Sequence, residues 1–332
     1  WTGVTNNPAF EFAGSPNRSM QVYGSLTLVS GMSVSYPFSA GRWEFWSSAP
    51  GNTITTAGKQ MQDVSTRGDG GSWTLQDNLN AAQQVGIFYG TFTTNNFTIN
   101  TGTFVSTTGC GGCNNRTVNL GSSVINCSVQ WNIFGDAGMT LNTGTSTIRT
   151  PSFTSSGNAT YYNAEMNGSG VNGVDLSGTV VFNNFDFTAG TALSFSGSLG
   201  SGSFTATNRL GLNRPGSTIT FISGSTITVN GILDLPNPGA GCSALTTLQT
   251  IVPGSPVTIS KSSGSVVSSR MSIKDITATG GATFTANQSV NQGGNSGWTI
   301  NAPAASSYYW IGGTGSWNDG NHWSTSSGGA AS

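Results

Sequence analysis

Charged residues are scarce in this sequence of 332 residues. They make up 7% of it, with 11 Lys and Arg against 12 Asp and Glu and a net charge of −1. About a quarter of an average globular protein is charged. Nucleic-acid binding requires many Lys and Arg to neutralise phosphates, so this balance argues against a nucleic acid as partner. The polar surface must therefore consist of hydroxyl and amide groups rather than ions.

Groups that carry catalysis or bind metals are also few. His322 is the only histidine, so a catalytic triad or a zinc site would depend on it alone. The carboxylates stand singly, and the nearest pairs are Asp63 with Asp69 and Asp175 with Asp186. Glycoside hydrolysis requires two carboxyls about 5–10 Å apart. We therefore expect no enzymatic activity, no metal and no cofactor, with a carbohydrate-active β-helix enzyme, a polysaccharide lyase or hydrolase, as the alternative.

Only four cysteines occur, and they permit three disulfide pairings: Cys110, Cys113, Cys127 and Cys242. The CGGC spacing of the first two is also found in redox and zinc sites. Redox chemistry requires a helix N-terminus that lowers the thiol pKa, and no helix is expected there; zinc requires a second close pair. Because disulfides form in exported proteins, we expect a tight loop between the first two cysteines or longer pairings, with Cys127 and Cys242 paired across distant turns in the first case.

Long apolar runs and helix signals are lacking. No apolar run reaches the roughly 20 residues of a membrane span, so no membrane insertion is expected. The best helical candidate is the short segment 77–84 (DNLNAAQQ). Disorder is excluded as well, because 35% of the residues are hydrophobic and 10% are aromatic, too many for a chain that cannot form a core.

Glycine is abundant instead, with 48 residues, and short runs of Val, Ile, Phe and Thr alternate with Ser and Thr along the chain. Apolar residues at every second position are typical of strands with one buried face. The segments 90–109 and 216–235 show this pattern. The sequence therefore predicts an all-β protein, either a sandwich or barrel or a solenoid of stacked turns.

Weak internal repeats favour the solenoid. Asn, Gly, small hydroxyl residues and an apolar residue recur at 100–105, 119–125 and 142–148, and the glycines of these segments are 19 and 23 residues apart. That is about one turn of a parallel β-helix. The segments GSTITF (216–221) and GSTITV (224–229) begin only eight residues apart, so we place them on two sides of one turn.

We predict a right-handed parallel β-helix or β-solenoid rod with capping segments. Each turn would stack ~4.8 Å above the last, so about a dozen turns give a rod of roughly 60 Å. Stacked turns place like residues above like, which allows ladders of Asn, Ser and Thr outside and Val, Ile and Phe inside. Glycine and asparagine suit corners with positive φ.

Exposed aromatic residues can stack on sugar rings, which would make the chain a lectin-like adhesin. Trp43 and Trp46 are the candidates, together with Tyr161 and Tyr162. The competing interpretation is packing into the core or into a cap, because the open end of a solenoid is an unpaired sheet edge that needs a cover.

Thr-x-Thr pairs with regular spacing are typical of the flat ice-binding faces of some β-solenoids. Such a face requires threonines in register over many turns, and the spacings drift here, so ordinary strand alternation explains them. The pairs are Thr53 with Thr55, Thr91 with Thr93, Thr218 with Thr220, and Thr226 with Thr228.

Several motifs near the C-terminus point to a family. They are Ile273-Lys274-Asp275, the run ATGGATF at 278–284, GGNSGW ending at Trp298, NAPAASS at 301–307 and YYWIGGTGSWNDGNHWSTSSGG at 308–329. The first three resemble the closing segment of repeat modules in very large secreted surface proteins, chiefly of Bacteroidetes-type bacteria. The last two resemble the linker and the start of the next module.

This resemblance implies a structural repeat module of an extracellular adhesin or filament on the bacterial cell surface, without enzyme activity. We divide the chain into a first solenoid section with an aromatic cap (1–85), a solenoid body (86–300), a linker (301–307) and a Trp-rich junction (308–332) that belongs to or docks on the next repeat. The expected partners are neighbouring copies joined head to tail, with glycans or surfaces as further partners.

The junction is expected to dock through its aromatic residues. Each buried aromatic side chain contributes roughly 1.5–3 kcal/mol, so several together would hold a joint rigid. The lone histidine is expected to stack or to form a hydrogen bond within this segment. The residues are Tyr308, Tyr309, Trp310, Trp317, His322 and Trp323, with Trp1 as the continuation of the preceding segment.

Overall fold

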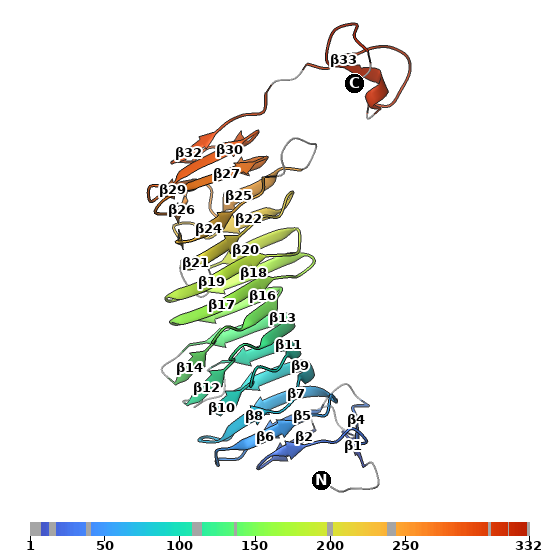
Figure 1. The fold of residues 1–332 in the computed structure, drawn as a ribbon, viewed down its shortest axis with the longest axis vertical. Helices are drawn as coiled ribbons and strands as arrows, with labels where there is room; N and C mark the ends of the chain where they lie inside the picture. Colours follow the sequence, from blue (N-terminus) through green and yellow to red (C-terminus); the bar gives the residue numbers. More distant parts are fainter. Residues whose placement is uncertain are drawn as a thin grey trace.

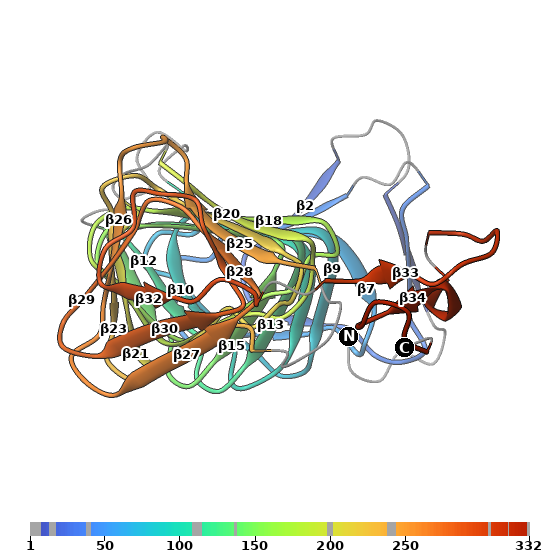
Figure 2. The same ribbon diagram turned by 90° about the horizontal axis from the view of Figure 1, so that it is seen from above.

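The chain forms a rod of stacked parallel strands in the computed structural model (Figure 1). About 12 turns are stacked, and the predicted parallel β-solenoid is confirmed. Figure 2, a view from above, shows the strands of successive turns superposed around a common interior. In the part of the chain that is described, the only helix is the single 3₁₀ turn η1 (Gly320–His322). The structure describes residues 8–12, 18–37, 41–107, 115–135, 138–197, 202–237, 244–304, 307–317 and 319–330.

The first face of the rod is one parallel ladder that runs from end to end. Its longer strands bend around a corner, so that only their last residues belong to this face. In chain order it contains β2 (Ser19–Val22), β5 (Arg42–Phe45), β7 (Gln60–Thr66), β9 (Leu79–Ile87), β11 (Ile99–Ser106), β13 (Val124–Phe134), β16 (Ser152–Ser156), β18 (Val171–Leu176), β20 (Ala192–Ser196), β22 (Thr218–Phe221), β25 (Thr246–Thr250), β28 (Met271–Ile273) and β31 (Val290–Asn291).

The second face begins with a separate six-stranded parallel sheet. Where this sheet ends, Thr143 Oγ1 donates a hydrogen bond to Thr160 O at 2.7 Å, and strands that begin with β17 continue the face. The sheet contains β3 (Leu26–Thr27), β6 (Asn52–Thr55), β8 (Ser72–Leu75), β10 (Gly90–Thr93), β12 (Arg116–Asn119) and β14 (Met139–Asn142). The continuation contains the first residues of β17 (Ala159–Met166), β19 (Val180–Phe187) and β21 (Phe204–Gly211), followed by β23 (Thr226–Val229), β26 (Val257–Ser260) and β29 (Ile276–Thr279).

The third face closes each turn. It uses the first residues of β7, β9, β11 and β13 and the last residues of β17, β19 and β21. The Ser269 amide donates a hydrogen bond to Pro236 O at 2.9 Å and links the two halves of this face. The remaining strands are β15 (Thr147–Thr150), β24 (Ile232–Asp234), β27 (Ser265–Ser269), β30 (Thr283–Asn287) and β32 (Trp298–Ile300).

The alternation of apolar and polar residues decides which side chains fill the interior. In β10 the ring of Phe92 is completely buried while Thr91 and Thr93 point outward. Aromatic rings stack along the rod axis because successive turns place them above one another: Phe104 lies 4.8 Å from Trp131, measured between ring centroids. The interior therefore contains a column of aromatic side chains, which continues through Phe153, Phe182, Phe185, Phe195 and Phe221.

The repeats seen in the sequence are only partly equivalent in space. Gly121 and Gly144 occupy the same corner of successive turns, and the Thr145 amide donates to Gly121 O at 2.7 Å. Gly102 lies elsewhere, inside β11, where it faces the bulges of the neighbouring strands β9 and β13. On the turn below Gly121, Asn96 occupies this corner with a positive φ of 66°. Its side-chain oxygen accepts a hydrogen bond from the Ser122 amide of the next turn. The predicted equivalence of Gly102 with Gly121 is therefore wrong, and the predicted equivalence of Gly121 with Gly144 is confirmed.

Two further expectations can be compared with the strands. The segments GSTITF and GSTITV form β22 on the first face and β23 on the second face, so their placement on two sides of one turn is confirmed. The best helical candidate, 77–84, lies mainly in β9. In β9 the apolar residues Leu79, Ala81 and Val85 are buried at spacings that suit a bent strand.

The two ends of the rod differ. At the N-terminal end, β1 (Ala9–Glu11) and β4 (Ser33–Ser35) pair with each other, and the ring of Phe12 stacks on Tyr36 at 5.1 Å. The C-terminal end is the edge of β32, after which the chain leaves the rod (Figure 1). The predicted boundary at residue 85 lies inside β9, in a ladder that continues through it.

Candidate functional site

The C-terminal segment folds back on itself beyond the last turn of the rod (Figure 1). Its two short strands, β33 (Tyr309–Trp310) and β34 (Trp323–Ser324), pair in antiparallel fashion. This pairing places the ring of His322 against Trp310, with centroids 4.8 Å apart and planes 10° from parallel. His322 Nδ1 also lies 2.8 Å from Gly312 O. The lone histidine therefore stacks and forms a hydrogen bond, as expected, within a structural cluster.

Trp323 is the centre of this cluster. Its ring meets Trp310 at 5.3 Å and Trp317 at 4.5 Å, both edge to face, and its Nε1 donates to Trp317 O at 2.9 Å. The outer rings are nevertheless open to solvent, because Trp317 is 76% exposed and Tyr308 is 57% exposed. Docking of this segment on a neighbouring copy stays a prediction, and Trp1 lies outside the described residues.

The aromatic residues considered for sugar stacking divide into two classes. Trp43 is 0% exposed, its ring lies 5.4 Å from Phe12, and its Nε1 donates to Tyr36 Oη at 2.8 Å. The interpretation of Trp43 as a glycan-stacking residue is therefore wrong, because strand alternation turns it inward beneath the N-terminal strands. Trp46 is partly exposed at the same end, and its Nε1 lies 3.3 Å from Glu44 Oε2. Its stacking role stays a prediction.

The tyrosine pair considered with them divides in the same way. Tyr161 is fully buried, which raises the pKa of its hydroxyl to about 12. The next residue along β17, Tyr162, points outward and is exposed. Only Tyr162 can therefore present a ring to a ligand.

Only one cysteine lies among the described residues. Cys127 is a free thiol in the interior of β13, and burial raises the pKa of this thiol to about 12. It is therefore protonated at neutral pH and is not a nucleophile. The predicted pairing of Cys127 is therefore wrong, whereas Cys110, Cys113 and Cys242 lie outside the described residues, so pairings among these three stay predictions.

The first cluster of charged residues lies on the first face near the N-terminal end. Arg42 Nε is 3.6 Å from Asp63 Oδ2, and Arg67 Nε is 3.2 Å from Glu44 Oε1. Burial raises the pKa of Asp63, although Arg42 and Arg67 oppose this shift. The partners belong to β5, β7 and the residue after β7, so these ion pairs join successive turns.

The second cluster lies on the third face, where five charged side chains follow one another along the rod. Arg149 Nε lies 2.7 Å from Glu165 Oε2. Arg209 bridges two carboxylates, with 2.9 Å from its Nε to Asp186 Oδ1 and 2.7 Å from its Nη2 to Asp234 Oδ2. Burial raises the pKa of Asp186; Arg209 opposes this, and Glu165 and Asp234 reinforce it.

This second cluster meets one condition for a carbohydrate-active enzyme, since acids and bases converge on one surface. Its geometry favours a structural role. Arg209 lies between Asp186 and Asp234 and contacts both, and the space beside the Asp186 carboxylate is filled by the chain, since a Cβ added to Gly211 would lie 1.9 Å from its Oδ1. A glycosidic bond would have to displace Arg209 to reach the pair.

Threonines on the second face are in register although their spacing in the sequence drifts. The corners between strands absorb the differences in turn length, so the drift does not misalign the strands. The hydroxyls of Thr74, Thr91 and Thr117 form no hydrogen bond within the described part of the chain. One column contains Thr53, Thr74, Thr93, Asn119 and Asn142, and the other contains Ser72, Thr91, Thr117 and Thr140.

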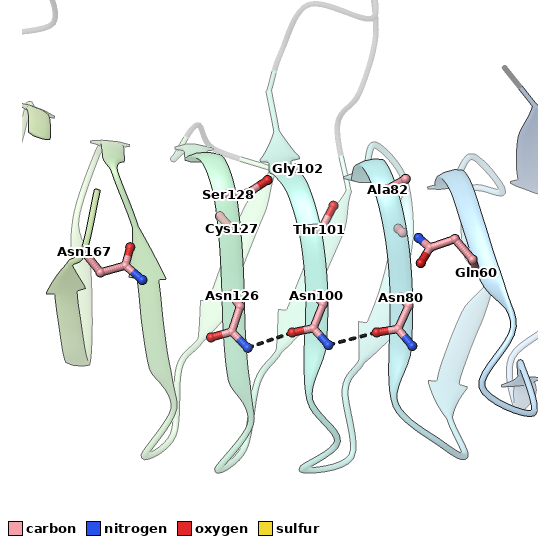
Figure 3. Close-up of a pocket in the computed structure, with 11 residues that line it drawn as sticks. Gln60, Asn80, Ala82, Asn100, Thr101, Gly102, Asn126, Cys127, Ser128 and Asn167 are labelled. Atoms are coloured by element: carbon pink, nitrogen blue, oxygen red, sulfur yellow. Dashed lines mark hydrogen bonds between the residues drawn. The ribbon is translucent and has the colours of Figure 1, made fainter. Parts of the chain in front are cut away.

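A ladder of asparagines on the third face borders a groove (Figure 3). Asn100 Nδ2 donates to Asn80 Oδ1, and Asn126 Nδ2 donates to Asn100 Oδ1, both at 2.8 Å. Each internal bond uses one of the two N–H groups of an amide and one lone pair of its oxygen, so further donors and acceptors remain for a ligand. The three side chains come from β9, β11 and β13, whose partners are in direct register.

The groove arises at a place where β9 and β13 each bulge by one residue and β11 between them does not. Between Thr101 and Thr103, β11 has one residue, Gly102, whereas its two neighbours each have two. The middle turn is therefore shorter than the turns on either side. Gly102 is required there, because a Cβ would lie 2.5 Å from Gln83 O. The groove has a volume of about 490 Å³.

None of the eleven residues that line this groove is charged. The set is amide and hydroxyl side chains with a few small residues, so its chemistry is that of uncharged hydrogen bonds. The lining is formed by Gln60, Asn80, Ala81, Ala82, Asn100, Thr101, Gly102, Asn126, Cys127, Ser128 and Asn167.

Sequence reasoning expected ladders of asparagine in general but did not locate this one, and it missed the second charged cluster. A signal for the ladder was present, because a Leu-Asn or Ile-Asn pair followed by a small residue recurs at 79–81, 99–101 and 125–127. The charged cluster has no such signal, since its residues occur in unrelated local sequences.

Searches of the described residues for other sites gave two negative results. They contain no helix that is both long and apolar enough to cross a membrane. They also contain no group of three His, Cys, Asp or Glu side chains arranged to hold a metal ion. In comparisons with known proteins, no family model, no curated protein and no solved structure matches this chain.

Proposed function

We propose that this chain is a structural repeat module of an extracellular fibre or adhesin, joined end to end through the segment 307–330. The observation that carries the proposal is the position of that segment. It lies beyond the last turn of the rod (Figure 1), and it presents rings such as those of Trp317 and Tyr308 to solvent. The resemblance of the same residues to module junctions supports this role.

The rod itself suits a mechanical function. Its backbone groups are paired from turn to turn along three faces, and the aromatic column ties successive turns together through contacts such as Phe104 with Trp131. Because each turn contacts mainly its neighbours, the rod can be extended by further modules without changing its fold. The open edge of β32 is the natural place for a following unit, since an unpaired edge needs a cover.

We propose that the module has no enzymatic activity and acts outside the cell, on a bacterial surface. The sequence supports the first statement, because it offers a single histidine and carboxylates that stand singly, whereas a catalytic triad or a glycosidase requires such groups in sets. The family resemblance at 262–300 and 308–329 supports the location. Activity of the purified chain on polysaccharides would contradict the first statement.

Self-association of the full chain tests the joint. We expect end-to-end oligomers that grow with concentration, because a contact between different ends of identical copies does not close. Replacing Trp317 and Tyr308 together with alanine should raise the dissociation constant at least tenfold. Sedimentation velocity measures the association, and small-angle scattering measures the length of the particles.

The control for this test is Tyr162→Ala, which removes an exposed ring from the side of the rod and should leave association unchanged. Particles that double in thickness rather than in length would show lateral packing and contradict the proposed joint. A chain that stays monomeric at every concentration would contradict it as well.

The register of threonines on the second face favours a second candidate function, binding of ordered water at an ice surface. Hydroxyls repeat every ~4.8 Å between turns and every ~6.7 Å along a strand. Tetrahedral hydrogen bonds of about 2.75 Å place next-nearest oxygens in ice ~4.5 Å apart and repeat along the perpendicular axis every ~7.4 Å. The two lattices agree within about a tenth over the few turns from β8 to β14.

Inhibition of ice recrystallisation tests this second candidate. The full chain should slow the growth of ice grains at micromolar concentration, and Thr117→Tyr should abolish the effect by lifting the surface away from the lattice. The matched control is Thr247→Tyr on the first face, in β25, which should retain it. Grain growth unaffected by the unaltered chain would exclude the ice-binding function.

A further inference from the structure

We propose that the groove beside the asparagine ladder binds a neutral oligosaccharide, with the sugar chain lying along the rod axis. This inference rests on the function proposed above, because the groove would serve as the adhesive contact of that module. The groove has the size of a small-molecule site, since such sites occupy ~300–1,000 Å³ and this one has about 490 Å³.

The direction of the ligand follows from the way the groove is built. Asn80, Asn100 and Asn126 lie on successive turns and point to the same side (Figure 3). Their amides therefore repeat every ~4.8 Å along the rod. The exposed side chains of Gln60 and Asn167 extend the lining at its two ends. A short ligand would contact one amide, whereas an elongated chain contacts several in sequence.

The chemistry of the ladder selects hydroxyl groups. Each asparagine amide carries two N–H donors and an oxygen with two lone pairs, and the ladder of Asn100 uses one donor and one acceptor. The remaining donor and acceptor lie on the same amide. A sugar hydroxyl both donates and accepts, so adjacent hydroxyls of one ring can bind the two ends of one amide.

The groove also discriminates against other polymers. No charged side chain lines it, and Arg149, which follows Asn126 on the next turn, is already paired with Glu165, so a polyuronate or sulfated chain would leave its anions without a free partner. An extended peptide gains most of its affinity by adding a strand to a sheet edge, but the backbones of β9, β11 and β13 are already paired with one another. Only their side chains are available, which leaves an uncharged, hydroxyl-rich chain as the matching ligand.

The short corner of β11 gives the groove its depth. Because β11 is one residue shorter than β9 and β13 at this corner, Gly102 and Thr101 form a floor between Ala82 and Ser128. The floor is held by the hydrogen bond that Thr101 Oγ1 donates to Thr103 O at 3.2 Å, and Cys127 is buried beside Thr101 on the neighbouring strand β13. One sugar ring would fit into this notch between Ala82 and Ser128, while the adjacent rings of the same chain contact the asparagine amides.

One such groove would bind weakly, because it is open and contains no aromatic ring for stacking. Repetition of the module compensates, since linked weak sites gain effective concentration and bind with an avidity 10²–10⁴ times the single-site affinity. Weak binding per module is therefore the expected property of a repeated adhesive surface.

Binding of defined oligosaccharides by the full chain tests the proposal. The probes are cellohexaose, xylohexaose and mannohexaose as neutral chains, and an alginate hexamer as an anionic chain. Saturation-transfer NMR detects weak binding, and titration gives the dissociation constant. We expect at least one neutral hexamer to bind and the alginate hexamer to bind at least tenfold more weakly.

Two variants locate the site. Ala82→Phe fills the notch from an exposed position and leaves the ladder intact, so it should weaken binding at least tenfold. Asn100→Asp keeps the size of the side chain but removes its N–H donors, and should have a similar effect. The matched control is Asn142→Asp, which makes the same change in the amide ladder of the second face and should bind like the unaltered chain.

The outcomes distinguish a failure of this proposal from a failure of the proposed end-to-end joint. Circular dichroism of each variant confirms that it is folded, and neither variant alters the segment 307–330. Failure of every neutral hexamer to bind would overturn the proposal while leaving end-to-end association as measured. Equal loss of binding in Asn100→Asp and Asn142→Asp would place the ligand elsewhere and overturn it too, as would preference for the alginate hexamer.

Discussion

Replacing Trp131 with alanine is expected to lower the free energy of unfolding by about 3–5 kcal/mol, as for other large aromatic side chains removed from a core. The indole is 0% exposed in the middle of the rod. It stacks on Phe104 at 4.8 Å, and Tyr161 meets it edge to face at 6.2 Å. Its neighbours lie on different turns, so one substitution removes contacts that tie three turns together.

The cavity left by this substitution cannot close easily. The ring sits between strands whose spacing is fixed by the backbone ladder, and interior packing leaves little freedom for adjustment. Tyr161 Oη, which the Trp131 Nε1 approaches at 3.5 Å, keeps its bond with Ser155 Oγ at 2.8 Å. The loss is therefore mainly one of packing rather than of a buried hydrogen bond.

Urea unfolding followed by far-ultraviolet circular dichroism measures the change. The matched control is Trp317→Ala, which removes the same side chain from a site that is 76% exposed and should change stability by less than about 0.5 kcal/mol. Because neighbouring turns support one another, the central substitution should also broaden the transition. Equal stability of the two variants would show that the aromatic column is not what holds the turns together.

Alternation within single strands was enough to predict strands with one buried side. In β5 the indole of Trp43 is completely buried and the preceding Arg42 is exposed, while Glu44 is largely covered and forms an ion pair with Arg67. The burial of Trp43 therefore follows from the alternation that predicts the strand. The interpretation of Trp43 as a glycan-stacking residue was based on its being a tryptophan and ignored its position in the strand. The two Thr-x-Thr segments around 216–229 were placed correctly for the same reason, since each strand shows its own period of two.

Contacts between turns were not predictable in the same way. They depend on how many residues each corner absorbs, and that number changes from turn to turn. Arg149 meets Glu165 across 16 residues, whereas Arg209 meets Asp234 across 25. No fixed repeat length places both pairs in register, so the charged cluster could be found only from the structure. The asparagine ladder is intermediate, because its Leu-Asn and Ile-Asn pairs recur but at unequal spacings.

The corners, which set these contacts, should be the second most sensitive part of the rod. Gly144 has a φ of +56°, a region where a side chain costs about 1–3 kcal/mol. A Cβ at this position would also lie 2.3 Å from Gly121 O of the preceding turn, and relief of such a clash costs about 1–3 kcal/mol more. Gly144→Ala is therefore expected to lower the free energy of unfolding by about 2–6 kcal/mol.

Gly224→Ala separates these two contributions. Gly224 has a φ of +76°, so it carries the same conformational cost, but a Cβ there meets no atom within 4 Å. The variant should lose only about 1–3 kcal/mol, and the difference between the two variants in urea unfolding reports the contact between turns. Equal losses would mean that the corner of Gly144 moves away from Gly121 without cost. The stacking of corners would then contribute nothing to the rod, and the corners would constrain register through chain length alone.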